Sequence, residues 1–354
     1  MKITLDNITI IKNAEIEFSG LTVIAGKNDT GKTTVGRCLY QAVTNYMSIP
    51  DDSSRFIVSA INKSNDGTVI AGINKDKDFE TYQRDIKEDG FRLFLQFESE
   101  QEIEQVILID SPTTLDTFAY IKNAGLLFMQ KRLFFNIDEH RTDLIVLLSQ
   151  DITKKNKIPK KWFVQSKALY QKITHLIGGE VYYSKQKDNI LYKKHLGKID
   201  NKTLKIEKRE FDKISEDDNF IILNISDTAN GIKMFGYLQM LLLNNSLKKG
   251  SVLILDEPEV HLHPTWQLKY AEVIVELVKN EIKVLVNSHS PYMVEALQRY
   301  AEKEKIATDF YLAKDGYIQK QEDSNNMTLS CIFDELSEPF IDFDEMDSER
   351  LQNV

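Results

Sequence analysis

Hydrophobic and polar residues alternate along the first 25 positions of the chain, a period that predicts half-buried β-strands. Three short strands are expected there, at residues 2–10, 14–18 and 21–25. A helical period follows, from Lys32 to about Met47. Further strands are predicted near residues 67–74, 80–84, 91–97 and 105–110. Residues 1–114 are therefore expected to form a first, β-rich lobe.

The apolar spacing becomes helical again between residues 115 and 177, and Gly178 and Gly179 end that pattern as a helix C-cap would. We interpret residues 115–180 as a helical arm inserted between the two halves of one domain. A hairpin is then expected at residues 181–183 and 190–193. Strands at 203–208 and 220–225 are expected to return the chain to the core.

Two continuous apolar runs, at residues 252–255 and 284–286, predict strands that are buried on both faces of a parallel sheet. Strands at 305–312 and 317–320 are expected to complete this sheet, so residues 181–354 form the second lobe. The predicted fold class is α/β: a mixed β lobe and a parallel sheet flanked by helices, with an inserted helical arm.

The loop between the third strand and the first helix carries the strongest chemical signal. Gly26 and Gly31 enclose four residues, and Lys32 and Thr33 follow, which matches G-x-x-x-x-G-K-[ST] without deviation. Such a loop wraps phosphates with backbone N–H groups, because glycines permit unusual dihedral angles and close approach. The expected ATP contacts are Gly26, Asn28, Asp29, Thr30, Gly31, Lys32, Thr33 and Thr34.

Within this loop, Lys32 is expected to serve catalysis by placing its charge on the β and γ phosphates, at a helix N-terminus that favours the same anions. The Thr33 hydroxyl is a predicted Mg²⁺ ligand. The alternative is a chance glycine turn before a helix, and the strand, loop and helix context argues against it.

Polar residues follow both buried strands. Asp256 is a predicted Mg²⁺ ligand, and Glu257 is the predicted general base for the attacking water. His289, after the strand at 284–286, is predicted to sense the γ-phosphate. Adjacent acids usually form only a solvated turn, and a lone histidine is more often structural. The phosphate loop upstream favours the functional interpretation of all three.

A second anion site is predicted where the helix ending near Leu243 begins. Its expected nucleotide contacts are Asn230, Gly231 and Lys233. The loop at Gly26 already encloses one set of phosphates, so this segment is expected to cap the ATP of a second protomer.

The composition, 42% hydrophobic and 28% charged over 354 residues, is that of a globular protein with a sizeable core. No run of about 18 apolar residues is present, and the first residues lack the apolar region of a signal peptide. The two cysteines fit no disulfide or metal framework. The sequence predicts a cytoplasmic protein without a membrane-spanning segment.

Charge is distributed unevenly along the chain, whose net charge is −9. Residues 152–213 contain 17 Lys and Arg against 6 Asp and Glu. This basic segment could bind nucleic acid through phosphates, or it could be a solvated helix face or a dock for an acidic partner. Residues 334–349 are acidic and interleaved with apolar residues, which favours an amphipathic segment packed on the ATPase or a partner over a metal cage.

Together these residues resemble the ABC-type ATPases of the SMC, RecF and OLD group, in particular compact members with the string Asp-Glu-Pro-Glu-x-His-Leu-His-Pro. That string spans residues 256–264 here, and the resemblance covers residues 1–40 and 220–300. It implies a head-to-tail homodimer or higher oligomer that encloses two ATP molecules. Each ATP would lie between the phosphate loop of one chain and the signature segment of the other.

The chain departs from this pattern at three places. The signature is replaced by residues 228–233, so Asn230 stands where the usual serine would. His263 stands where transporter ATPases have an aspartate. Asp110, after the strand that begins at Gln105, occupies the place of the Q-loop glutamine and is a further predicted Mg²⁺ ligand.

We expect an ATP-hydrolysing switch that acts with a separate effector protein, in a bacterial anti-phage defence or toxin-control system. The alternative is a DNA-repair or chromosome-maintenance ATPase that clamps nucleic acid. A transporter subunit is disfavoured by the missing signature and the inserted arm. No nuclease activity is expected of the chain itself, because only about 50 residues follow the last predicted helix and part of these complete the sheet.

Overall fold

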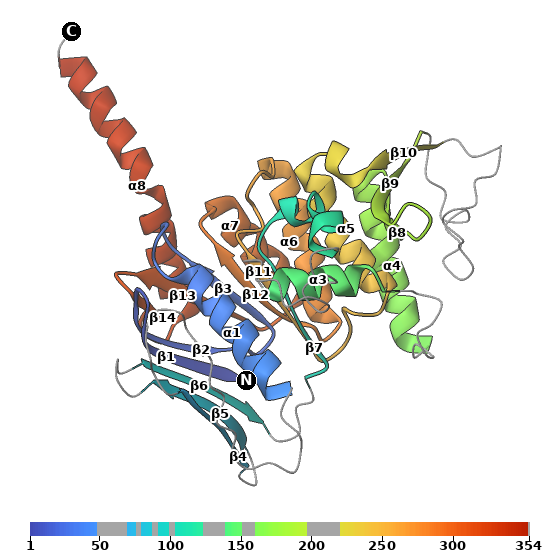
Figure 1. Cartoon of the computed structure of the whole chain (residues 1–354). Coiled ribbons are helices and arrows are strands. Elements are labelled where there is room, and N and C mark those ends of the chain that lie inside the picture. Colours follow the sequence, from blue (N-terminus) through green and yellow to red (C-terminus); the bar gives the residue numbers. More distant parts are fainter. Residues whose placement is uncertain are drawn as a thin grey trace.

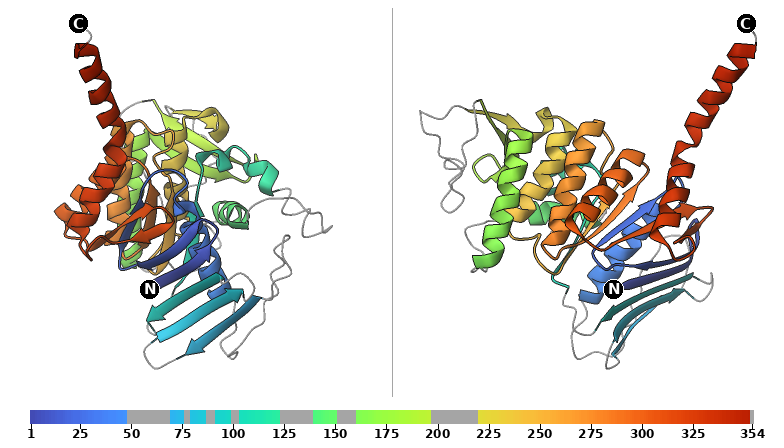
Figure 2. Two further views of the ribbon diagram at one scale, coloured as in Figure 1. Left: turned by 90° about the vertical axis from the view of Figure 1, so that its left-hand side faces the viewer. Right: turned by 180° about the vertical axis from the view of Figure 1, so that it is seen from behind.

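The structure is a computed structural model that describes residues 1–47, 69–75, 79–86, 91–98, 103–122, 139–150, 160–196 and 220–352. Its main feature is an 11-stranded mixed sheet that curls around one helix and carries further helices on its other face (Figures 1 and 2). This arrangement confirms the predicted α/β class.

One half of the sheet is parallel, as the continuous apolar runs predict. Its strands, in spatial order, are β7 (Gln105–Ile109), β11 (Ser251–Asp256), β12 (Lys283–Ser288), β3 (Leu21–Ala25) and β13 (Thr308–Lys314). Successive side chains point to opposite faces, so Leu253 joins one hydrophobic core and Ile254 joins the other. Both faces are thus covered, which explains why these strands do not alternate in polarity.

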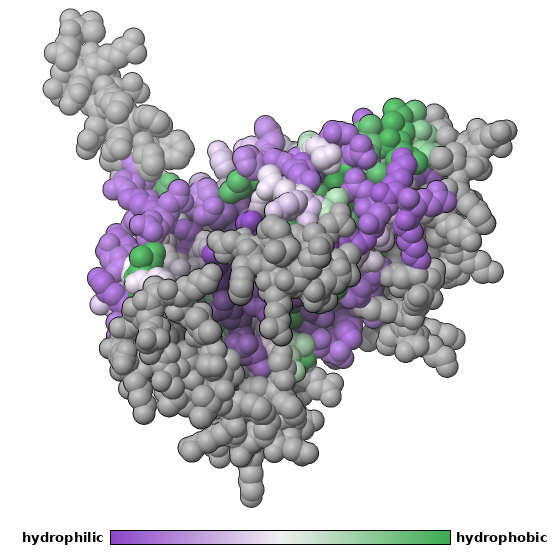
Figure 3. All heavy atoms as spheres, viewed as in Figure 1, coloured by the Kyte–Doolittle hydropathy of each residue, from purple (hydrophilic) through white to green (hydrophobic). Residues whose placement is uncertain are grey.

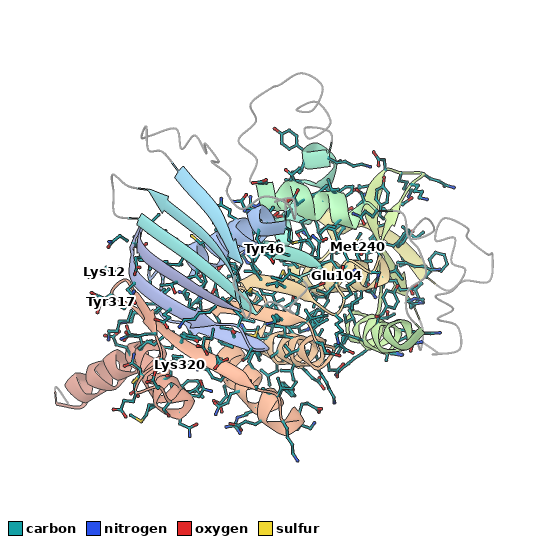
Figure 4. The ribbon with its side chains drawn as sticks, turned by 90° about the horizontal axis from the view of Figure 1, so that it is seen from below. Lys12, Tyr46, Glu104, Met240, Tyr317 and Lys320 are labelled. Atoms are coloured by element: carbon teal, nitrogen blue, oxygen red, sulfur yellow. The ribbon has the colours of Figure 1, made fainter. Side chains whose placement is uncertain are left out.

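The other half of the sheet is antiparallel apart from one pair. Its order continues through β14 (Tyr317–Gln319), β2 (Ile11–Glu17), β1 (Lys2–Ile8), β6 (Phe91–Glu98), β5 (Phe79–Ile86) and β4 (Val69–Lys75), with β14 parallel to β2. Lys12 of β2 and Tyr317 of β14 lie together at this junction, with the Lys12 ammonium 5.3 Å from the ring centroid (Figure 4). The strands predicted in residues 1–110 are confirmed to within three residues at each end.

Helix α1 (Lys32–Met47) lies inside the curl of the sheet. Val35, Leu39 and Val43 recur at helical spacing and are fully buried. They pack in one core with Ile3 and Leu5 of the antiparallel half. This packing holds the first turn of α1, and with it the glycine loop, at the carboxyl end of the parallel strands.

The opposite face of the parallel strands carries α5 (Asn230–Leu243), α6 (Pro264–Lys279) and α7 (Pro291–Glu304), joined by α3 (Glu139–Leu148) and α4 (Lys160–Ile177). The last two helices lie in the segment that was predicted to be an inserted arm. Leu148 and Ile173 are buried in the same core as Leu253, because each helix has an apolar face that only the core can cover. The boundaries at residues 114 and 180 remain a prediction. None of the helices in the described ranges has the length and hydrophobicity that crossing a bilayer requires.

A separate three-stranded antiparallel sheet consists of β8 (Gly179–Ser184), β9 (Asn189–His195) and β10 (Phe220–Asn224), with β9 in the middle. The predicted hairpin is confirmed, but β10 pairs with β9 and does not return to the main sheet. The strand expected at 203–208 lies outside the described residues. Apolar side chains gather over β9 and β10 on the molecular surface (Figure 3), where Leu196 is 50% exposed and Ile221 is 44% exposed.

Helix α8 (Asn325–Gln352) contains the acidic segment. Its first turns pack on the core through buried Leu329 and Ile332, and its remainder extends away from the body (Figures 1 and 2). Glu335 of α8 forms ion pairs with Lys314 of β13, at 2.7 Å, and with Lys27 of the glycine loop, at 3.3 Å. The predicted packing of this segment on the ATPase core therefore agrees with the structure for its first turns.

Candidate nucleotide-binding site

The predicted site residues lie in a row at the carboxyl edge of the parallel strands. Leu255 is in register with Ile109, so Asp256 and Asp110 follow their strands side by side. Asp256 is in turn in register with Asn287 of β12. In an open α/β sheet, ligands bind in the crevice outside this edge. Asp110 and Asp256, which are 256 − 110 = 146 positions apart in the sequence, thus lie side by side because their strands are neighbours and parallel.

The glycine loop between β3 and α1 requires both of its glycines. Gly31 has a φ of +95°, which side chains rarely adopt. At Gly26, a Cβ atom would lie 2.2 Å from the carbonyl oxygen of Ala313 in β13. Asp29 adopts a φ of 60°, a conformation that costs a non-glycine residue about 1–2 kcal/mol. Such strain concentrates at ligand-binding loops.

Lys32 lies folded back over this loop. Its ammonium donates hydrogen bonds to the carbonyl oxygens of Gly26, at 2.9 Å, and of Lys27, at 2.6 Å. Burial lowers the pKa of Lys32, and the nearby carboxylates of Glu257 and Asp256 oppose that shift. The loop carbonyls hold the charge in place, so a phosphate oxygen could exchange with them as a partner for the ammonium.

Asp256 and Asn287 connect the strand ends to the start of α1. Asn287 Nδ2 donates to Asp256 Oδ1 and to the carbonyl oxygen of Lys32, each at 2.9 Å. Burial raises the pKa of Asp256, and hydrogen bonds from Asn287 and Thr33 act in the opposite direction. Asn287 is fully buried, and sequence reasoning missed it. The signal was a polar residue directly after the apolar run that ends at Val286.

The oxygen atoms of Thr33 and Asp256 suit Mg²⁺, a hard cation that protein sites usually hold through one or two carboxylates plus substrate phosphates. Thr33 also acts on the Asp256 carboxylate, whose pKa it lowers, so the two side chains lie near one another. Among the residues that the structure describes, no group of three or more His, Cys, Asp or Glu side chains could hold a metal on its own. The donor set therefore fits an ion that arrives with a phosphate ligand.

Glu257 and His289 face each other across the strand ends. His289 Nδ1 lies 3.2 Å from Glu257 Oε1, an ion-pair distance without the direction of a regular hydrogen bond. Contact with His289 lowers the pKa of Glu257, and contact with Glu257 raises the pKa of His289. Glu257 has a φ of 49°, and its N–H donates to the carbonyl oxygen of Asn287 at 2.9 Å. This strained turn places the Glu257 carboxylate beside the His289 ring.

Two residues of helix α3 contact the carboxylate of Asp110. His140 Nε2 lies 3.0 Å from Asp110 Oδ2, and Arg141 donates to both carboxylate oxygens at 2.8–3.2 Å. Burial alone would raise the pKa of Asp110, but these partners lower it to about 2. Sequence reasoning missed His140 and Arg141, because nothing local links them to a strand 30 residues earlier. The role of Asp110 as a Mg²⁺ ligand stays a prediction.

The predicted signature segment lies at the start of α5. Lys233 is buried, and its ammonium forms an ion pair with Asp116 of the same chain at 2.6 Å. Gly231 packs against the Trp266 indole, where a Cβ atom would lie 2.6 Å from the ring. Asn230 is half-buried at the first helical position. Lys233 therefore points inward in this structure, and the contacts of all three residues with nucleotide stay predictions.

A glycine loop between a parallel strand and a helix, with Asp256 at the end of the nearby strand β11 and Glu257 directly after it, defines the class of P-loop ATPases. More narrowly, the chain belongs to the family described as "AAA domain, putative AbiEii toxin, Type IV TA system", whose sequence model matches residues 21–295.

Solved structures with a similar fold include two SMC heads and one transporter cassette. An SMC head bound to the C-terminal winged-helix domain of ScpA is 14% identical with a TM-score of 0.46, covering 90% of this chain and 95% of that one. The SMC head domain from Thermotoga maritima is 11% identical with a TM-score of 0.42, covering 90% and 96%. A dimeric bacterial ABC transporter cassette is 11% identical with a TM-score of 0.34, covering 90% and 97%. Likenesses this distant carry no inference about partners.

Proposed function

We propose that the chain binds and hydrolyses ATP at the edge formed by the glycine loop, β11 and β12. The observation that carries this proposal is the Glu257–His289 pair, 3.2 Å apart, beside a loop that holds a buried lysine. Phosphoryl transfer asks a protein mainly for positioning and charge neutralisation. The glycine loop, Lys32 and the ends of β11 and β12 supply both positioning and charge at the same edge of the sheet.

Each residue has a separate task in this proposal. Loop N–H groups and the N-terminus of α1 bind the phosphates, and Lys32 exchanges its loop carbonyls for phosphate oxygens. Glu257 accepts a proton from the attacking water, and its lowered pKa keeps it ionised for that task. His289 orients Glu257 and contacts the terminal phosphate. Thr33 and Asp256 hold Mg²⁺, which when bound neutralises developing negative charge.

ATP binding by this proposal joins two chains head to tail. The half-buried Asn230 and the N-terminus of α5 would face the ATP of the second protomer, whereas Lys233 would support the segment through Asp116. Output comes from the changed dimer geometry, because a ligand that binds one arrangement better shifts the population toward it. The family description supports a role in a toxin–antitoxin or anti-phage defence system, in which a separate effector reads the ATP state.

Phosphate release from ATP by the purified chain, with and without Mg²⁺, tests the central step. Wild type is expected to release phosphate slowly and only with the metal. Lys32→Ala is expected to lose nucleotide binding, and Glu257→Gln to keep binding but lose at least a hundredfold in turnover. Leu268→Ala, an exposed change on α6, is the control and keeps wild-type turnover. Equal turnover by wild type and Glu257→Gln contradicts the proposal.

A further inference from the structure

Glu259 is a buried carboxyl group that the proposed chemistry does not use. It lies two residues beyond Glu257, and its side chain is 3% exposed. One of its oxygens, Oε1, accepts hydrogen bonds from Ser288 Oγ at 2.7 Å, from the His289 N–H at 2.8 Å and from the Ser290 N–H at 3.2 Å. A single oxygen therefore holds three consecutive residues of the β12–α7 loop.

A second buried contact holds the same loop. The Ser290 hydroxyl donates to Gln267 Oε1 at 2.7 Å, and Gln267 Nε2 donates to the carbonyl oxygen of Leu262 at 3.0 Å. Glu259, Leu262 and Gln267 all belong to the segment that follows β11. The loop that carries His289 is thus attached at two points to the segment that carries Glu257.

Burial at this depth is unfavourable for a carboxyl group. Burial raises the pKa of Glu259, and its second oxygen, Oε2, has no hydrogen-bond partner among the described residues. An apolar side chain of similar size would avoid that desolvation, so a stability role alone explains the residue poorly. What an apolar side chain cannot do is accept three hydrogen bonds from one loop.

We propose that Glu259 is a positioning residue that sets His289 against Glu257 by fixing the backbone of the β12–α7 loop. This inference rests on the proposed ATP hydrolysis. His289 Nδ1 is 3.2 Å from Glu257 Oε1 and 3.6 Å from Glu259 Oε1, so this one ring atom lies near both carboxyl groups. Without Glu259, the His289 N–H loses its acceptor, and the Ser290 N–H keeps only the Ser288 hydroxyl, at 3.1 Å. The loop can then turn the imidazole away from Glu257.

Glu259→Gln and Glu259→Ala separate positioning from charge. Glutamine keeps an acceptor at Oε1, so it is expected to retain at least half of the wild-type kcat. Alanine removes the acceptor and is expected to lower kcat at least tenfold, with the Kd for a fluorescent ATP analogue changed by less than threefold. Glu180→Ala is the matched control, because Glu180 is a fully buried carboxyl of β8 remote from the loop. It is expected to lower the Tm but leave kcat within twofold.

A double variant tests whether Glu259 acts through His289. Glu259→Ala added to His289→Ala is expected to cause no further loss of kcat, because the ring that it positions is already absent. Ser288→Ala removes one donor with little risk to folding, and is expected to lower kcat several-fold in wild type but not in His289→Ala. The Ser288→Ala variant therefore tests the same positioning role if Glu259→Ala does not fold.

Three results overturn the inference: wild-type kcat in Glu259→Ala, equal loss in Glu259→Gln and Glu259→Ala, or losses that add to those of His289→Ala. Where Glu259→Ala does not fold, wild-type kcat in Ser288→Ala overturns it as well. Each of these outcomes leaves ATP hydrolysis by the wild type intact. Failure of the wild type to release phosphate with ATP and Mg²⁺ would instead refute the proposed function itself.

Discussion

Asn287 donates both of its amide hydrogens across the candidate site, one to Asp256 Oδ1 and one to the carbonyl oxygen of Lys32, each at 2.9 Å. It thereby ties the carboxylate of β11 to the first residue of α1. Lys32 and Asp256, which are 256 − 32 = 224 positions apart in the sequence, share this one side chain as a partner. A replacement that cannot donate should separate them.

Asn287→Ala is expected to lower the free energy of unfolding by about 1–3 kcal/mol, because it removes one donor from the buried Asp256 carboxylate and one from a helix carbonyl. It should also raise the Kd for ATP with Mg²⁺ at least tenfold. Urea unfolding and titration with a fluorescent nucleotide measure the two effects. Asn280→Ala, at the C-cap of α6, is the control for loss of an asparagine. An unchanged nucleotide Kd in Asn287→Ala would refute the linking role.

Gly26→Ala should prevent the glycine loop from closing. The added Cβ atom would lie 2.2 Å from the carbonyl oxygen of Ala313, which is backbone and cannot rotate away. We expect nucleotide binding to fall at least a hundredfold and the Tm to fall by several degrees. Gly20→Ala is the matched control, since its nearest contact, at 3.3 Å, is a Val278 methyl group. Wild-type nucleotide affinity in Gly26→Ala would contradict this geometry.

Glu257→Gln should hold the chain as an ATP-bound dimer. The variant keeps the glycine loop and Lys32, so it can bind ATP, but it lacks the general base that hydrolysis requires. Light scattering is expected to show twice the monomer mass with ATP and the monomer mass with ADP. Lys32→Ala should remain monomeric with either nucleotide. If Glu257→Gln has one mass under all conditions, and that mass is the monomer's, the head-to-tail arrangement is wrong.

The ion pair of Asp110 with Arg141 and His140 predicts a specific dependence of stability on pH. The folded pKa of about 2 lies below the ordinary value of 3.8, so the ionised carboxylate stabilises the folded state. That contribution, roughly 2 kcal/mol, is complete above about pH 4 and is lost as the pH falls toward 2. Asp110→Asn removes it.

Urea unfolding at pH 6, 4 and 3 measures the difference between wild type and Asp110→Asn. The difference should be largest at pH 6 and should shrink at pH 3. Asp315→Asn, in an exposed turn, is the control and should differ little from wild type. A difference between wild type and Asp110→Asn that does not change with pH would show that the ion pair does not stabilise the fold.

The sequence by itself determined the features that depend on local spacing. The helix 32–47 begins and ends where the period predicted, and the strands around Val23, Leu253 and Val286 follow the apolar runs. The glycine loop is equally local, since its two glycines and its lysine lie within seven residues. Asp256, Glu257 and His289 were predictable because parallel strands bring their carboxyl ends to one edge.

Only the tertiary structure decided which distant side chains meet. Asp110 pairs with Arg141, Lys233 turns inward to Asp116, and Glu259 holds the loop at His289. Helices α3 and α4 pack on the core, and β10 joins the hairpin sheet, also through contacts between distant segments. Periodicity tells that a face is apolar or a residue is charged, but not which partner covers it. That choice depends on contacts between segments far apart in the chain, and it is settled when the whole core packs.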